Sequence, residues 1–201
     1  GKRLGPDTAT VGEGEVIAQA RTAPGFHSIV VDGPAELVYT AGTRAALVVR
    51  AQRNILALLA TRVDEGVLRI SFTRSAIMPA YPRIEASSET LGALTLSSGG
   101  SVRLNGLHGE SLRLELTGSG DVLADGEVRN VSMRSTGSGD INASQLRARR
   151  LQVALAGSGA VTAQAQDAAD VDSAGSGDVV VAGNPARRKV VRRGSGQVRF
   201  D

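Results

Sequence analysis

The stretch STGSGDINA, residues 135–143, decides the fold, because close copies of it recur through the second half of the chain. The clearest copies are LTGSGDVLA (116–124), LAGSGAVTA (155–163) and SAGSGDVVV (173–181), and SSGGSVRL (97–104) and RGSGQVRF (193–200) align with them. The last glycine of each copy is Gly100, Gly120, Gly139, Gly159, Gly177 or Gly196. A period near 19 residues, sustained over six copies, predicts a repeat architecture in which each repeat forms one coil.

The residues around each corner predict what lies inside the coils. We call the last glycine of each copy the corner glycine. The second residue after it is always Val or Ile: Val102, Val122, Ile141, Val161, Val179 and Val198. Parallel pairing of successive coils would stack these side chains into one inward column. Period-two alternation places Val131 and Met133, then Leu151, Val153 and Leu155, on one face of later strands. We therefore predict an all-β parallel β-helix, or β-solenoid, of about six short rungs, with right-handed coiling as the default for parallel crossovers.

The chain divides into three predicted parts: an N-terminal arm (1–24), an N-terminal β segment continuous with the solenoid (25–95) and the repeat β-solenoid (96–201). Within the arm, EVIAQAR (15–21) is compatible with one added strand or with a partly ordered segment. Within the β segment, short apolar runs are separated by turn residues. Asn54 is expected to cap one short helix, with an apolar stripe of Ile55, Leu58, Leu59 and Val63.

Composition excludes several classes of protein. Aromatic residues make up 2% of the chain, so the core must consist of Val, Leu, Ile and Ala. There is no cysteine, hence no disulfide framework. The net charge is only +3 and Arg residues alternate with carboxylates, which argues against a nucleic-acid partner. No apolar run approaches the ~18 residues of a membrane helix. The first residue is Gly1 rather than Met, and we expect that a leader has been removed.

Four features resemble a bacterial family, the putative auto-transporter adhesin, head GIN domain. They are FHSIVVDGPAELVYTAG (26–42), NILALLATRVDEGVLRISF (54–72), LGALTLSSGGSV (91–102) and the serial Gly-Ser-Gly-Asp-Val corners. The resemblance covers about residues 26–200. It implies a β-helical protein exported by bacteria of the Gram-negative type, in the periplasm or at the cell surface. It brings no catalytic residue with it.

The Gly-Ser-Gly-Asp corners have three interpretations. A phosphate loop requires a following helix, and each corner here precedes a strand. A calcium site requires six to eight oxygen ligands, whereas the column offers only Asp121 and Asp140 as carboxylates on adjacent rungs. The third interpretation is structural: glycines with positive φ form a tight bend, and Ser and Asp side chains accept backbone N–H groups. We favour the structural corner and keep Asp121 and Asp140 as weak calcium candidates, with no other metal or cofactor predicted.

The sequence offers no catalytic constellation. His27 and His108 have no partners at ligand or triad spacing, and both are interpreted as ordinary surface or bend residues. The remaining candidate for interaction is a set of arginines. It comprises Arg147, Arg149, Arg150, Arg187, Arg188, Arg192 and Arg193.

Arg147 and Asp167 lie equally many residues after the corner glycines of two successive coils, and so do Arg150 and Asp170. Equal spacing would place each arginine beside its aspartate, and Arg188 lies at the position of Arg150 and Asp170 one coil further on. This spacing predicts an ion-pair ladder, or alternatively a surface that docks anionic envelope glycans, lipid headgroups or protein. We expect a non-enzymatic exported protein that acts in binding or adhesion. The alternatives are self-association through open solenoid edges as a homo-oligomer, and a calcium-stabilised repeat module.

Overall fold

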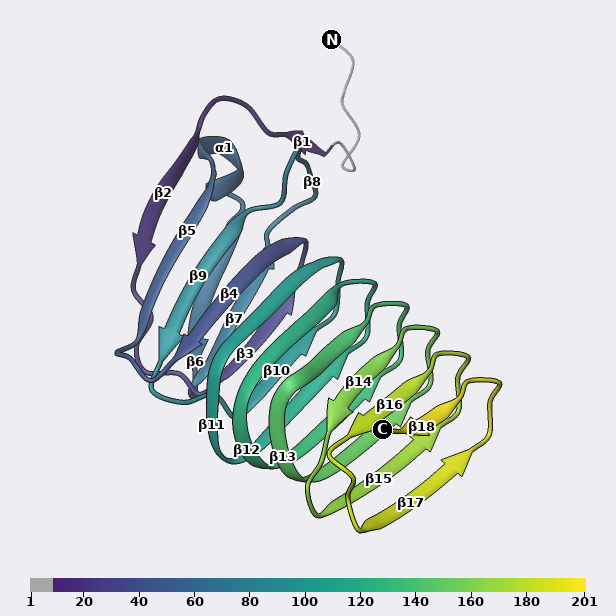
Figure 1. Cartoon of the computed structure of the whole chain (residues 1–201). Coiled ribbons are helices and arrows are strands. Elements are labelled where there is room, and N and C mark those ends of the chain that lie inside the picture. The colour runs from purple at the N-terminus through teal and green to yellow at the C-terminus, as the bar shows by residue number, and fades with distance from the viewer. Residues whose placement is uncertain (1–8) are drawn as a thin grey trace.

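Residues 9–201 are described by a computed structural model, and nearly every element in them is a β-strand (Figure 1). Sixteen strands form one large mixed sheet that is mostly parallel, and β1 (Thr10–Val11) and β8 (Ala76–Ile77) form a separate parallel pair. The helix of this part of the chain is α1 (Arg53–Leu56). The prediction of a mainly β fold with one short helix is confirmed. The first eight residues of the predicted N-terminal arm lie outside the described residues.

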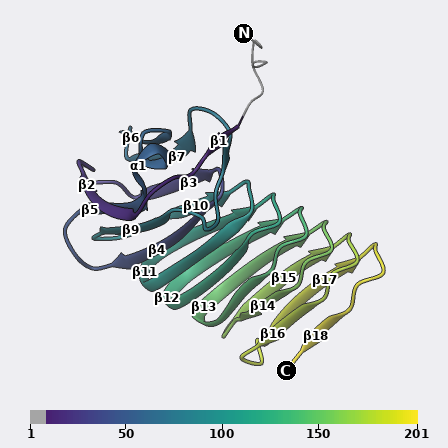
Figure 2. The same cartoon turned by 90° about the horizontal axis from the view of Figure 1, so that it is seen from above.

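The repeats form the regular part of the sheet, because each one pairs in parallel with the next. Three repeats are long strands that bend in the middle, and the later ones divide into two shorter strands (Figure 2). We call the part after each Gly-Ser-Gly corner the first limb and the part before the next corner the second limb. The strands are β11 (Gly100–Leu116), β12 (Asp121–Ser135), β13 (Ile141–Leu155), β14 (Val161–Gln164), β15 (Ala168–Ser173), β16 (Val179–Ala182), β17 (Arg187–Arg192) and β18 (Val198–Phe200).

The predicted inward column of the first limb is confirmed. Val102 pairs with Val122, Val122 with Ile141, and Ile141 with Val161, and the series continues through Val179 to Val198. All six are buried except Val198, which is half-buried. The strands keep this register because a shift of the pairing by one residue would move every apolar side chain from the core to the solvent face.

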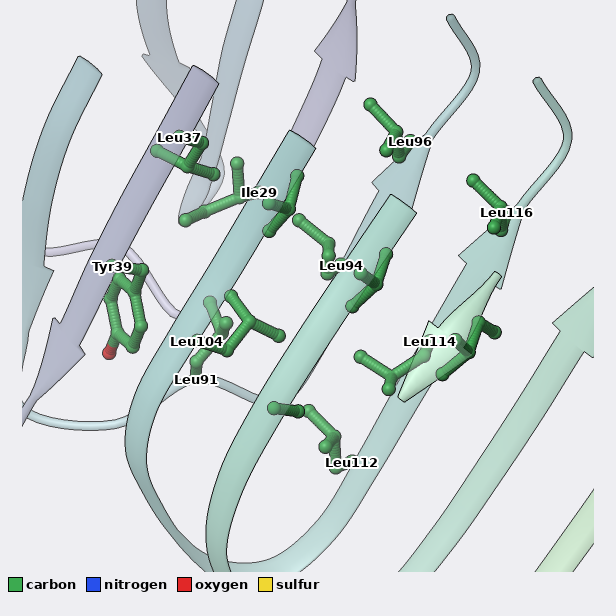
Figure 3. Close-up of a cluster of buried hydrophobic side chains, with 14 of the residues drawn as sticks. Ile29, Leu37, Tyr39, Leu91, Leu94, Leu96, Leu104, Leu112, Leu114 and Leu116 are labelled. Atoms are coloured by element: carbon green, nitrogen blue, oxygen red, sulfur yellow. The ribbon is translucent and has the colours of Figure 1, made fainter. Parts of the chain in front are cut away.

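The second limb supplies three further columns that face the first limb across a single apolar core. The middle column contains Leu94, Leu114, Met133, Val153 and Val171, all buried (Figure 3 shows the first two). The expected inward positions of the second limb are therefore confirmed. Aliphatic side chains fill the core throughout, as the shortage of aromatic residues predicts.

The N-terminal strands continue the same two limbs. β4 (Ala35–Ala41) pairs with the first limb of β11, and β10 (Ala93–Leu96) pairs with its second limb, so the core runs without a break into the repeats. Within this part Tyr39 is fully buried; its hydroxyl lies 2.7 Å from Ser88 Oγ, and burial raises the pKa of Tyr39. The strands are β2 (Val16–Arg21), β3 (Ser28–Asp32), β4 (Ala35–Ala41), β5 (Ala46–Gln52), β6 (Leu59–Asp64), β7 (Val67–Phe72), β9 (Arg83–Ser88) and β10 (Ala93–Leu96).

The predicted helix from Asn54 to Val63 is wrong in length and in its cap. α1 has four residues and ends at Leu56, and Leu59 already begins β6. β6 pairs antiparallel with β7 through a tight turn in which Glu65 and Gly66 both have positive φ, the geometry of a two-residue hairpin. Asn54 does not cap the helix. Its Nδ2 donates to the Val11 carbonyl oxygen (2.7 Å) and its Oδ1 accepts the Glu13 N–H (3.0 Å).

The segment EVIAQAR forms a strand. β2 pairs antiparallel with β5 and lies at the end of the first-limb sheet, while β6 lies at the end of the second-limb sheet. Both strands belong to the same end of the molecule as α1 (Figure 1). The opposite end is formed by β17 and β18.

Candidate functional site

The Gly-Ser-Gly corners are stacked so closely that only glycine fits. A Cβ atom at Gly139 would overlap the Gly120 carbonyl oxygen, and one at Gly159 would overlap the Gly139 carbonyl oxygen. Among the six last glycines of the corners, only Gly100 has a positive φ. The expectation that these glycines serve a left-handed bend is therefore wrong for the other five. Glycine is needed there because the backbones of adjacent coils approach each other without room for a side chain.

The aspartates after the corners bond to backbone, as expected. Asp121 Oδ1 accepts the Asp140 N–H and Asp140 Oδ1 accepts the Ala160 N–H, each at 2.8 Å. Asp178 Oδ1 accepts the Gln197 N–H at 2.9 Å. Each carboxylate therefore reaches the same position of the next coil and ties two coils together. A hydrogen bond to a charged group contributes about 1.5–3 kcal/mol when sheltered, and less at an exposed corner.

The same bonds define the surroundings of the two calcium candidates. Asp121 and Asp140 each use one carboxylate oxygen for a backbone N–H. Within residues 9–201, no group of three or more His, Cys, Asp or Glu side chains is arranged to hold a metal ion. The structure thus assigns both residues a role in joining coils.

Ala160 interrupts the series of aspartates, and this gap gives a prediction. In the variant Ala160→Asn, the new Oδ1 should accept the Asp178 N–H without adding a charge beside Asp140. We expect the free energy of unfolding, measured by urea denaturation, to rise by about 1 kcal/mol. Ala156→Asn is the matched control, since this exposed alanine precedes the corner. Equal stability of the two variants would count against the role assigned to the aspartates.

The arginine candidates of β13 lie at the bend between the two limbs. Arg147 and Arg149 line a hollow of about 380 Å³, and Arg150 lines a neighbouring hollow of about 420 Å³. The first hollow crosses four successive bends, the last of them through Gln166, and also contains acidic and imidazole groups. Its charged or titratable lining residues are His108, Glu110, Glu127, Arg129, Arg147 and Arg149.

The arginine candidates of β17 and of the corner after it are divided between different surroundings. Arg188 and Arg192 occupy inward positions, in register with Ala169 and Ser173 of β15. The Arg188 guanidinium stacks 4.4 Å from the Phe200 ring centroid, and Arg192 Nε donates to the Gly196 carbonyl oxygen (3.1 Å). Arg193 pairs with Asp172 at 2.9 Å. The seven arginines therefore do not form one surface.

The predicted ion-pair ladder is wrong in its register. Arg150 pairs in the sheet with Ala168, two residues before the expected Asp170. The ion pair that forms joins Arg149 Nη1 to Asp167 Oδ2 at 3.3 Å, and both side chains are about half exposed. Such an exposed pair contributes only about 0–1 kcal/mol. Arg147 has no carboxylate partner within 4.0 Å among residues 9–201.

The exposed charges at the end of the stack bear on self-association. β17 is exposed along its whole length and carries Arg187 and Lys189 on its outward face. Like charges on an edge strand disfavour the pairing of two such edges. Pairing of β17 with the β17 of a second copy is therefore opposed by charge.

Sequence reasoning missed the hollow at the bend. His108 was interpreted as an ordinary bend residue, yet it lines this hollow, with Nε2 2.9 Å from the Glu89 carbonyl oxygen. The bends differ in length from coil to coil, so spacing alone does not show which side chains meet there. The only available signal was that Glu127 and Arg147 lie at nearly the same number of residues after their corner glycines, which would bring the two side chains close together in successive coils.

Comparison with known proteins places these features in a family. A family model described as "Putative auto-transporter adhesin, head GIN domain" matches residues 25–185. No curated protein matches the chain. The helix in residues 9–201 is too short and insufficiently apolar to cross a membrane.

Solved structures with a similar fold include proteins of Bacteroides and Parabacteroides species. A protein of Bacteroides fragilis, described as a putative adhesin, is 22% identical, with a TM-score of 0.79 over 96% of this chain and 100% of its own. A putative adhesin of Parabacteroides merdae is 17% identical, with a TM-score of 0.63 over 96% of this chain and 99% of its own. A protein of Parabacteroides distasonis, described as a putative lipid binding protein, is 21% identical, with a TM-score of 0.58 over 96% and 100%.

Proposed function

Because the chain belongs to the putative auto-transporter adhesin, head GIN domain family, we propose that it is a non-enzymatic binding protein that acts outside the cytoplasm. Membership of this family implies an extracytoplasmic location, and we propose the periplasm or the cell surface. We further propose that the stack is a right-handed β-solenoid that presents a rigid side surface to its ligand. The parallel pairing of each repeat with the next supports this fold.

We propose that the ligand is an acidic glycan bound at the bend. The observation that carries this proposal is the pair of neighbouring hollows, with Arg147 and Arg149 in one and Arg150 in the other. Residues 147 and 150 are separated by about 10 Å along a strand, so one extended ligand with repeated anionic groups can contact both hollows. Arginine is suited to this role because its guanidinium donates two parallel hydrogen bonds to a carboxylate or sulfate.

The acidic residues of the first hollow favour a glycan over a membrane surface. Glu110 and Glu127 would repel the anionic groups of either ligand, but a glycan also offers many sugar hydroxyls, whose hydrogen bonds these carboxylates can accept. The lining residues of both hollows include no Phe, Tyr or Trp side chain. Recognition would therefore rest on hydrogen bonds and charge, and should weaken as the salt concentration rises.

Binding to immobilised polygalacturonate, with neutral dextran as the reference, tests the proposal. The wild-type protein should bind polygalacturonate and not dextran. The triple variant Arg147→Gln, Arg149→Gln, Arg150→Gln should lose about tenfold or more in affinity, since each charged hydrogen bond contributes about 1 kcal/mol or more. The matched control is Arg44→Gln, Arg74→Gln, Arg103→Gln, which removes three exposed arginines outside the two hollows. Equal losses in the two triple variants, or equal binding to dextran, would reject the proposed site.

A further inference from the structure

The end of the stack opposite to β17 contains an arginine in an unusual environment. Arg21, the last residue of β2, is part-buried and extends across the gap between the two limbs. Its Nη1 donates to the Leu59 carbonyl oxygen (2.6 Å) and to Thr61 Oγ1 (3.2 Å), and its Nη2 donates to the Leu56 carbonyl oxygen (2.9 Å). Its Nε donates to Gln19 Oε1 (2.9 Å). The guanidinium is thus held in one orientation by acceptors from β2, α1 and β6.

All of these acceptors are neutral. Within residues 9–201, no carboxylate lies within 4.0 Å of the Arg21 guanidinium. Burial lowers the pKa of Arg21, which means that the surroundings disfavour its charge. The four hydrogen bonds use four of the five N–H groups, and one N–H of Nη2 remains available.

Arg21 lines an open hollow of about 870 Å³ whose charged residues are all basic. The other two are Arg53 of α1 and Arg62 of β6, both exposed, and Thr22 and Thr61 belong to the same lining. Arg62 has a carboxylate neighbour only at 3.9 Å, in Asp64, and that pair is largely exposed. The three cations come from three different elements and line one hollow because β2 and β6 end the two limb sheets at the same end of the stack, where Arg21 of β2 bonds to β6.

We propose that this hollow, formed by Arg21, Arg53 and Arg62, binds a phosphate group. A tetrahedral phosphate presents oxygens in several directions and can bridge guanidinium groups from separate elements, whereas a planar carboxylate matches one guanidinium fork. Arg21 forms the fixed base of the site, and Arg53 and Arg62 close on the phosphate from the rim. The site is independent of the two hollows at the bend, since it shares no lining residue with either of them.

Two-dimensional NMR of the full chain, titrated with inorganic phosphate against sodium chloride at equal ionic strength, tests the site. Amide signals of β2, α1 and β6 and the Arg21 Nε–H signal should shift in a saturable manner. The double variant Arg53→Gln, Arg62→Gln leaves the hydrogen bonds of Arg21 intact and should weaken the phosphate affinity about tenfold or more. The control Arg103→Gln, Arg134→Gln removes two exposed arginines of the repeats and should bind like the wild-type protein.

A vesicle experiment distinguishes the two sources of phosphate. Sedimentation with phosphatidylglycerol vesicles but not phosphatidylcholine vesicles, abolished in the Arg53/Arg62 variant, would assign the site to a phospholipid headgroup. Phosphate-dependent shifts without vesicle binding would assign it to a soluble phosphate compound. The absence of saturable shifts up to about 100 mM phosphate, well beyond a millimolar dissociation constant, would overturn the proposal. Shifts that persist unchanged in the Arg53/Arg62 variant would overturn it as well.

Discussion

Replacement of Gly139 by alanine should lower the free energy of unfolding by about 3–5 kcal/mol or prevent folding, which places it among the most damaging single substitutions. The added Cβ would overlap the Gly120 carbonyl oxygen of the preceding coil. The obstacle is backbone, which cannot rotate away as a flexible side chain would. Relief would require the two coils to separate and would break the parallel hydrogen bonds between them.

Gly25→Ala is the matched control for this substitution. A Cβ atom at Gly25 would have no heavy atom within 4 Å, and Gly25 does not have a positive φ. Its replacement should change stability by less than about 1 kcal/mol, with a small gain expected from the stiffer unfolded chain. Urea denaturation followed by circular dichroism measures both variants. Similar midpoints would show that the corners have room to adjust and that their glycines are dispensable.

The variant Leu114→Ala should cost about 2–5 kcal/mol, the range for removing a large aliphatic side chain from a closed core. Leu114 is 1% exposed and lies between Leu94 and Met133 in the middle column of the second limb (Figure 3 shows Leu94 beside it). Because the coils above and below are fixed by their own hydrogen bonds, the cavity cannot collapse easily.

A leucine on the outer face provides the comparison. Leu123 follows the corner of the next coil but points outward and is only half-buried. Leu123→Ala should cost less than about 1 kcal/mol, since little apolar surface returns to water. Thermal unfolding of the two variants at the same pH compares them directly. If both lose the same stability, the assignment of inward and outward columns is at fault.

The repeat could be predicted because every coil carries the same signals at nearly the same spacing. The inward column from Val102 to Val198 follows each corner directly, so no error in length accumulates between the corner and the column. The second limb was less predictable. The first inward residue of the second limb follows its corner glycine after 12, 11, 12, 10 and 11 residues in successive coils, from Leu112 in the first of them to Arg188 in the last. This variation explains why the ion-pair ladder was misplaced by two residues.

The errors near the N-terminus have a different cause. The run from Ile55 to Val63 fits a helical stripe, but it also contains a buried Leu59 that starts a strand once the Glu65–Gly66 turn brings β7 alongside. Local periodicity cannot decide between these states, because the hairpin partner determines the result. The contacts of Arg21 with α1 and β6 were equally inaccessible, since they join residues that are 35–40 positions apart.

The inward arginines of β17 constrain how a protein of this kind can change in length. A duplicated repeat inserted between β12 and β13 would meet mainly aliphatic side chains on both sides, Val131 and Met133 on one and Leu151, Val153 and Leu155 on the other, and would extend the existing apolar core. A repeat stacked beyond β17 would enclose Arg188 and Arg192, and buried guanidinium groups without anions are costly. Lengthening by gene duplication, or by design, is therefore permitted in the interior of the stack and penalised at this end.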